Sequence, residues 1–200
     1  MADTEGPVTK GAGPRLGPSL TRRRPPWAVF TLRNDPWPAA ATAELLERDG
    51  RVFRLNGREL LERGTLFTVF ARELGFPGYF GHNWDALVDC LHDRHDEQDT
   101  AVVIDHADGL LGVDFLGTFV SVLCQAAWRA NLRLDADGVP DPDWNPFALH
   151  FVFLLDGASP AAFAEAVSAG MDVEVSLGEG RLMATLAGDD WPTCGSGKPE

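Results

Sequence analysis

The chain has 200 residues and a hydrophobic fraction of 44%, which is enough for one domain to bury a core without disulfides or metals. Its net charge of −13 argues against binding to a nucleic-acid backbone and favours a basic partner. The sequence shows no run of 18 apolar residues and no secretory signal, so we expect no membrane span and a cytoplasmic location.

The charge is unevenly distributed along the chain. Residues 79–115 contain nine Asp and Glu side chains and one Arg, a net charge of −8, whereas residues 1–26 carry a net charge of +3. Three cysteines with no repeated spacing, Cys90, Cys124 and Cys194, argue against a disulfide framework and favour a reducing cytosolic setting.

The first 50 residues divide into two parts. Residues 1–26 are rich in Gly, Pro, Ser and Thr and predict a disordered tail, in which the Arg22–Arg24 run is a solvated end rather than a nucleic-acid contact. Residues 27–50 predict a strand at 27–32 and a helix over 38–48 with Leu45 and Leu46 facing inward, an N-terminal extension that packs on the core.

Residues 51–156 predict the central α/β domain, in the order strand, two helices, strand, helix, strand. Two of the strands are continuous apolar runs, the pattern of strands buried on both faces, and crossovers through helices favour a parallel sheet. The predicted strands are 51–55, 101–105 and 149–155, and the predicted helices are 65–74, one that begins at Asn83, and 114–130.

The remaining segments are shorter. Residues 132–147 contain Asp-Gly and Asn-Pro signals and predict a loop insertion. Residues 157–187 predict a C-terminal extension that consists of a short helix from Ser159 and a hairpin across 178–180. Residues 188–200 predict a loose tail.

The most informative stretch is an aromatic-glycine loop that leads directly into a helix. Asn83 can cap this helix with its side-chain oxygen. Trp84, Leu87, Val88 and Leu91 recur at the spacing of one buried helical face, and Asp85, Asp89 and Asp93 recur at i, i+4 and i+8 on another. Like charges at this spacing cost an isolated helix about 0.2–0.5 kcal/mol per pair. The carboxylate stripe therefore indicates a surface that meets a positive partner.

The segment from Glu73 to Leu91, ELGFPGYFGHNWDALVDCL, resembles the motif of the barstar family, the intracellular inhibitors of secreted bacterial ribonucleases. The resemblance extends over about residues 51–156. It implies a three-stranded parallel sheet packed by helices, with no catalytic activity and no cofactor. The positions with matching residue types are Tyr79, Gly81, Asn83, Asp85, Ala86, Leu87, Asp89, Cys90 and Leu91.

The resemblance also implies a function. In such inhibitors the motif helix and the preceding loop plug the ribonuclease active site, and the aspartate matched by Asp89 lies where the substrate phosphate would lie. The expected partner is a basic extracellular-type ribonuclease or a related toxin, so the chain would act as an immunity protein. The candidate contact residues are Tyr79, Phe80, Gly81, Asn83, Asp85 and Asp89.

This chain departs from the family pattern at several contact positions. His82 stands where the type member has an acidic residue, and Val88 stands where it has a tryptophan. Residues 115–134, which include most of the predicted long helix, contain no carboxylate, and Trp128 lies near the place of the family's glutamate.

Two alternatives are open. One is a protein-interaction module of the same fold whose partner is not a nuclease. The other is a metal-dependent enzyme, because imidazoles and carboxylates recur at spacings of three and four residues and could share one helical face. The side chains that this alternative would use are His82, Asp85, Asp89, His92 and His95.

Overall fold

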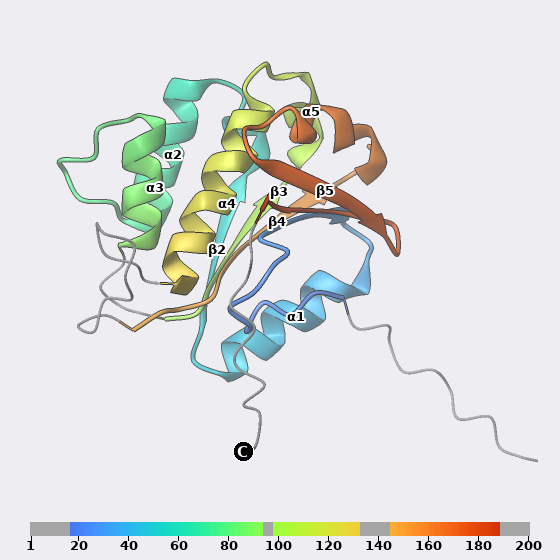
Figure 1. Cartoon of the computed structure of the whole chain (residues 1–200), viewed down its shortest axis with the longest axis horizontal. Helices are drawn as coiled ribbons and strands as arrows, with labels where there is room; N and C mark the ends of the chain where they lie inside the picture. Colours follow the sequence, from blue (N-terminus) through green and yellow to red (C-terminus); the bar gives the residue numbers. More distant parts are fainter. Residues whose placement is uncertain (1–16, 94–97, 133–144, 189–200) are drawn as a thin grey trace, which may run out of the picture.

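The computed structural model describes residues 17–93, 98–132 and 145–188 and folds them around one six-stranded β-sheet with helices on both faces (Figure 1). The α/β class predicted from the sequence is confirmed. The strand order is β2-β3-β4-β1-β6-β5. The strands are β1 (Ala28–Leu32), β2 (Arg51–Asn56), β3 (Thr100–Asp105), β4 (Leu149–Leu155), β5 (Val173–Gly178) and β6 (Arg181–Leu186).

The parallel part of the sheet has four strands rather than the three that the resemblance implies. β1 pairs in parallel with β4 and antiparallel with β6, and β5 pairs antiparallel with β6 at the edge. Phe30 of β1 lies opposite Phe153 of β4, and their rings stack at 4.1 Å between centroids. The N-terminal and C-terminal extensions therefore contribute strands to the same sheet as the central domain. The division of the chain at residues 50 and 156 stays a prediction.

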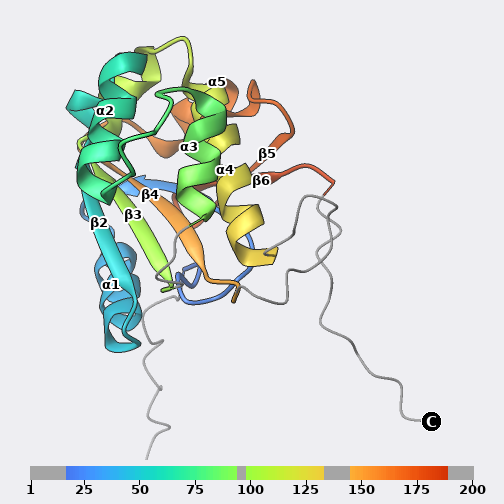
Figure 2. The same cartoon turned by 90° about the vertical axis from the view of Figure 1, so that its left-hand side faces the viewer.

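The helices cover the two faces of the sheet unequally. α1 lies alone on one face, and the remaining α-helices lie on the other, where α3 packs beside α4 (Figures 1 and 2). The α-helices are α1 (Pro36–Glu47), α2 (Arg63–Leu74), α3 (Trp84–His92), α4 (Leu116–Leu132) and α5 (Ala164–Ser168). Three 3-10 helices are η1 (Gly57–Glu59), η2 (Ala107–Gly112) and η3 (Pro160–Phe163). In these ranges no helix has the length and apolar character needed to cross a membrane.

Two hydrophobic cores follow from this arrangement. The larger core lies between the sheet and α2, α3 and α4, and it contains most of the buried aromatic side chains. The smaller core lies between the sheet and α1 and contains Trp37, Leu45, Val103 and Val152. β4 is buried along its whole length, as its continuous apolar run predicts for a strand covered on both faces.

α1 differs in detail from the prediction. It begins two residues earlier than expected, because Asp35 caps it and accepts a hydrogen bond from the Trp37 amide at 2.9 Å. Leu45 is fully buried, as predicted. Leu46 is 55% exposed, so its predicted inward orientation is wrong. Neighbouring helical residues point about 100° apart, and only one of the two can face the sheet.

The structure packs residues 17–26 against the body of the protein, whereas the sequence analysis assigned them to the disordered tail. Leu20 is 2% exposed, and the Trp37 indole N–H donates to the Pro18 carbonyl at 2.8 Å. The ring nitrogens of the buried His150 lie 2.8 Å from the Arg22 carbonyl and 3.1 Å from the Pro26 carbonyl. The expectations for residues 1–16, for most of the loop at 132–147 and for the tail from 189 lie outside the described residues.

Candidate protein-interaction site

Asn83 joins the aromatic-glycine loop to α3. Its backbone is extended, and its side-chain oxygen accepts a hydrogen bond from the Ala86 amide at 2.9 Å. Its side-chain NH₂ donates back to the Gly81 carbonyl at 3.3 Å. The predicted cap is therefore confirmed, and Asn83 also ties the end of the loop to the first turn of the helix.

Aromatic packing holds the loop from below. Phe80 is only 7% exposed and packs against Phe76 and Phe67, at 5.1 Å and 6.2 Å between ring centroids. Trp84, at the start of α3, packs edge-on against Phe67 at 4.8 Å. Phe80, a candidate contact residue, thus lies in the core of this structure, because its ring fills the space between the loop and α2. We therefore assign it to the support of the loop.

The other candidate residues form an exposed surface. Tyr79 is 84% exposed, although a tyrosine in a loop can usually bury part of its ring. Gly81 and Asn83 are exposed beside it. Asp85 lies in the first turn of α3, where a carboxylate interacts favourably with the helix dipole. Asp89 follows one turn later on the same side and is also exposed.

We call Asp85, Asp89 and Asp93 the acidic face of α3. All three side chains are exposed, whereas Leu87, Val88 and Leu91 of the same helix are buried against the larger core. The separation into a buried apolar side and an exposed acidic side is the one that the sequence predicts.

Arg129 of α4 is a residue of this surface that the sequence analysis missed. One of its guanidinium nitrogens lies 3.4 Å from an Asp89 carboxylate oxygen, and the two side chains are 46% and 65% exposed. An ion pair this exposed contributes about 0–1 kcal/mol, so Asp89 stays available to another cation. Only the packing of α3 on α4 brings the two residues together, and no local pattern in the sequence signals it.

The environment of the acidic face also fixes the protonation of two neighbours. Burial lowers the pKa of His92 below its ordinary value, although its ring nitrogen lies 2.8 Å from the Val88 carbonyl. His92 is therefore neutral at pH 7 and adds no positive charge. Burial, and then the charges of Asp89 and Asp93, raise the pKa of the Cys90 thiol, which stays protonated and is a poor nucleophile.

The metal-site alternative receives no support from the described residues. Within these residues, no three His, Cys, Asp or Glu side chains lie where they could hold one ion. His82 lies instead against the Phe80 ring, at 4.8 Å between centroids. His95, another of the proposed ligands, lies outside the described residues.

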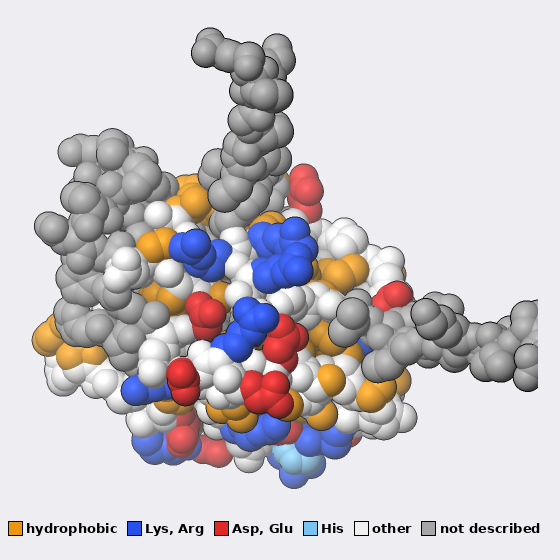
Figure 3. All heavy atoms as spheres, turned by 90° about the horizontal axis from the view of Figure 1, so that it is seen from below, with side chains coloured by type: hydrophobic (Ala, Val, Ile, Leu, Met, Phe, Trp, Pro, Cys, Tyr) orange, Lys and Arg blue, Asp and Glu red, His pale blue; other side chains and the backbone are white. Residues whose placement is uncertain are grey.

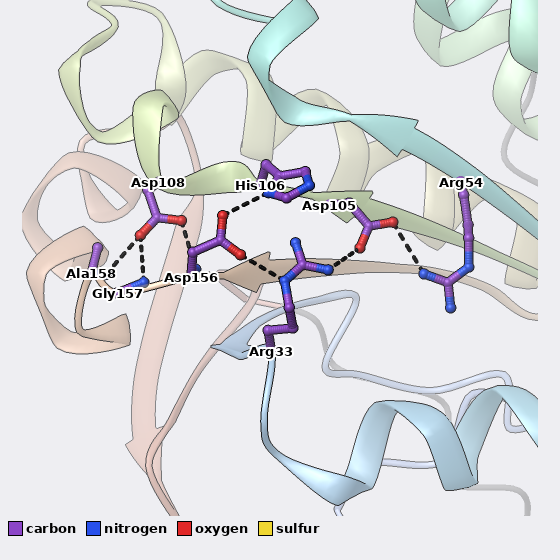
Figure 4. A network of polar contacts seen from close by, with 8 residues as sticks. All are labelled: Arg33, Arg54, Asp105, His106, Asp108, Asp156, Gly157 and Ala158. Carbon is purple, nitrogen blue, oxygen red and sulfur yellow. Dashed lines mark hydrogen bonds and ion pairs between the residues drawn. The ribbon is translucent and has the colours of Figure 1, made fainter.

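A second group of charged side chains lies at the carboxyl ends of the parallel strands (Figure 4). Arg33, just after β1, bonds to Asp156 at 2.6 Å and to Asp105 at 2.8 Å, and so bridges the ends of β4 and β3. Asp156 also bonds to the His106 ring at 2.6 Å, and Arg54 of β2 reaches Asp105 at 3.1 Å.

These carboxylates each follow or end a predicted strand, and the carboxyl ends of parallel strands meet at one edge of a sheet. Their positions after the strands could therefore have indicated the cluster. The charged groups of this cluster are paired with one another. Through these pairs the cluster links residues from all four parallel strands.

The fold and the site can be compared with known proteins. Residues 50–140 match the family model described as Barstar (barnase inhibitor). No curated protein matches the chain. Among solved structures, the chain is similar to the Aeropyrum pernix ORC2 protein in ADPNP-ADP complexes, at 12% identity and a TM-score of 0.39. That similarity covers 63% of this chain and 31% of the ORC2 chain, so this chain spans less than a third of the ORC2 length.

Proposed function

From the match of residues 50–140 to the barstar family model, we propose that the chain binds a basic ribonuclease through the 76–83 loop and α3 and blocks its active site. The exposure of Tyr79, Asp85 and Asp89 on one supported segment is the observation that carries the proposal. Phe80 and Asn83 fix the backbone beneath them, so little conformational entropy is lost when a partner binds.

The chemistry of the acidic face fits the active site of a ribonuclease. Such an enzyme binds a phosphodiester and therefore presents cationic side chains where the phosphate lies. A carboxylate placed there accepts charge-assisted hydrogen bonds, and an Arg fork can bind it through two of them. Under this proposal Asp89 takes the place of the phosphate, Asp85 pairs with a neighbouring cation, and Tyr79 packs on the rim of the active site.

The charge of the chain supports the same partner class. The net charge of −13 attracts a basic protein over a distance and speeds the encounter, and salt screens this attraction. The proposal implies an inhibitor that acts inside the cell, as an immunity protein does, and that has no catalytic activity of its own.

The test is inhibition of barnase by the full chain and by Asp89→Asn. The substitution keeps the shape of the side chain and removes its charge, and we expect affinity to fall by about 2 kcal/mol or more, roughly thirtyfold, the general threshold for a dominant interface side chain. Asp49→Asn is the matched control, because Asp49 is exposed at the far end of α1. Equal inhibition by wild type and both variants would contradict the role of Asp89.

Arg129 favours a second candidate, a partner whose surface is not uniformly basic. A purely cationic partner would repel Arg129, so Arg129→Ala should tighten its binding by up to about 1 kcal/mol, roughly fivefold. A partner that also presents a carboxylate to Arg129 would instead bind Arg129→Ala more weakly. If the wild type leaves barnase fully active, affinity capture from the source organism with wild type and Asp89→Asn identifies the partner that depends on the same carboxylate.

A further inference from the structure

A hollow of about 560 Å³ lies between residues 17–25 and α1. It is on the face of the sheet opposite α3, so the proposed ribonuclease-binding surface does not include it. Figure 3 shows this face from below, where basic and acidic side chains lie close together. The polar side chains that line the hollow are Ser19, Thr21, Arg22, Arg24, Glu44 and Arg48.

The hollow has an excess of positive charge in an acidic protein. Three guanidinium groups line it against one carboxylate, that of Glu44. Glu44 is already engaged, because Arg48 lies 3.6 Å from it and the Thr21 hydroxyl donates to it at 3.4 Å. Within residues 17–93, 98–132 and 145–188, the Arg22 and Arg24 side chains make no hydrogen bond or ion pair.

The three side chains of the Arg22–Arg24 run do not all face the hollow. Arg22 and Arg24 line the hollow, whereas Arg23 does not and donates instead to the Pro146 carbonyl at 3.5 Å. The backbone is held on both sides of the run, by the buried Leu20 before it and by the contacts of His150 with the Arg22 and Pro26 carbonyls. The Arg22 and Arg24 guanidinium groups, which have no partner in the described part of the chain, therefore extend from a fixed segment rather than from a loose tail.

The side of the hollow formed by α1 is mainly apolar. The hollow is lined on the α1 side by Trp37, Ala40 and Ala41, across from Arg22 and Arg24. Pro18 and Pro25 also line it. The volume lies within the range of about 300–1,000 Å³ that is typical of small-molecule sites. The hollow therefore combines an apolar wall with two guanidinium groups, those of Arg22 and Arg24, that have no partner among the described residues.

We propose that this hollow binds a small phosphate ester, with the phosphate held by Arg22, Arg24 and Arg48 and the organic part against Ala40, Pro18 and Pro25. The guanidinium fork matches the geometry of phosphate oxygens and binds them through paired hydrogen bonds. A nucleic-acid strand is a worse fit, because its many phosphates would meet the overall charge of −13 and only this one small basic area.

The test is calorimetric titration of the full chain at low ionic strength with adenosine monophosphate, adenosine and inorganic phosphate. We expect the monophosphate to bind, adenosine to show no binding, and inorganic phosphate to bind more weakly than the ester because it lacks contact with the apolar wall. No binding of the monophosphate by the wild type overturns the proposal. Equal affinity for inorganic phosphate and the monophosphate also overturns it.

Single substitutions in the arginine run locate the site. Arg22→Ala and Arg24→Ala should each weaken binding of the monophosphate about tenfold or more, since each removes charge-assisted hydrogen bonds. Arg23→Ala is the matched control and should leave the affinity unchanged. Equal losses in all three variants, or tighter binding of a single-stranded oligonucleotide than of the monophosphate, would overturn the proposal. Unchanged thermal unfolding of the variants shows that they remain folded.

Discussion

Asp35 lies at the junction of β1 and α1, and its carboxylate serves two elements at once. It accepts two hydrogen bonds from the Arg181 guanidinium of β6, at 2.6 and 2.9 Å, and one from the Thr31 hydroxyl at 2.7 Å. It also caps α1 through the Trp37 amide. Burial alone would raise the pKa of Asp35, but these hydrogen bonds, led by the one from Arg181, lower it to about 2.

Removal of this charge should destabilise the protein markedly. Asp35→Asn keeps a good capping residue but leaves the Arg181 guanidinium, which is 7% exposed, with only the exposed Glu179 as its counterion. We expect the free energy of unfolding to fall by about 3 kcal/mol, as for a broken buried pair. Urea denaturation at pH 7 measures it. Glu179→Gln removes the exposed second partner of Arg181 and should cost less than about 1 kcal/mol. Equal costs for the two variants would contradict this account.

For single residues, the sequence predicts contacts with near neighbours in the chain and misses contacts between residues that are far apart in it. Asn83 could be identified as a cap, because a cap needs only the next three residues. The Asp35–Arg181 pair joins residues 146 positions apart, and the Asp89–Arg129 pair joins residues 40 apart. The burial of Phe80 could not be predicted for the same reason, since it depends on packing against Phe67 of α2.

At the scale of elements, residues 17–26 act as a strap across α1 and the start of β4. Leu20 is its main apolar anchor and belongs to the smaller core. The apolar runs of β3 and β4 and the hydrophobic periodicity of α2 and α3 predict these elements, because the pattern of buried side chains is visible in the local sequence. The strap carries only one large apolar residue, so composition alone predicted it to be disordered.

Loss of the anchor should release the strap while the sheet remains folded. Leu20→Ala should accelerate tryptic cleavage within the Arg22–Arg24 run, because a protease needs a locally opened backbone. Leu46→Ala makes the same chemical change at a side chain that is 55% exposed and should leave the cleavage rate unchanged. Mass spectrometry of timed digests gives both rates. The same rate for Leu20→Ala as for wild type would show that Leu20 does not hold the strap.

At the scale of the whole molecule, charge and burial together set the response to acid. Burial lowers the pKa of His150 and of His92 below the ordinary value of 6.5, so the folded protein keeps both neutral. The pKa of Asp108 is lowered in the same way as that of Asp35. Burial would raise its pKa, but the amides of Asp156, Ala158 and Gly157 donate to its carboxylate and lower the pKa to about 2.

The free energy of unfolding should therefore fall in two stages as the pH decreases. Below about pH 6.5 the unfolded chain takes up protons on His92 and His150 that the folded chain does not. Below the ordinary aspartate value of 3.8 the same holds for Asp35 and Asp108, and their contribution is lost as the pH passes about 2. Urea titrations between about pH 8 and about pH 2 measure both stages. A constant free energy of unfolding from about pH 8 to about pH 5 would contradict the first stage.

The place of β1 within the sheet has a consequence for how the protein is made. β1 is flanked by β4 and β6, and the start of β4 at Leu149 lies 117 positions after Leu32. At synthesis rates of about 5–20 residues per second, the first partner of β1 leaves the ribosome roughly 6 to 23 seconds after β1 itself. During that interval the nascent chain carries an apolar strand with two unpaired edges, the feature that most readily joins one chain to another. A strand that joins the two parts of the folded sheet is therefore an aggregation hazard while the chain is still growing.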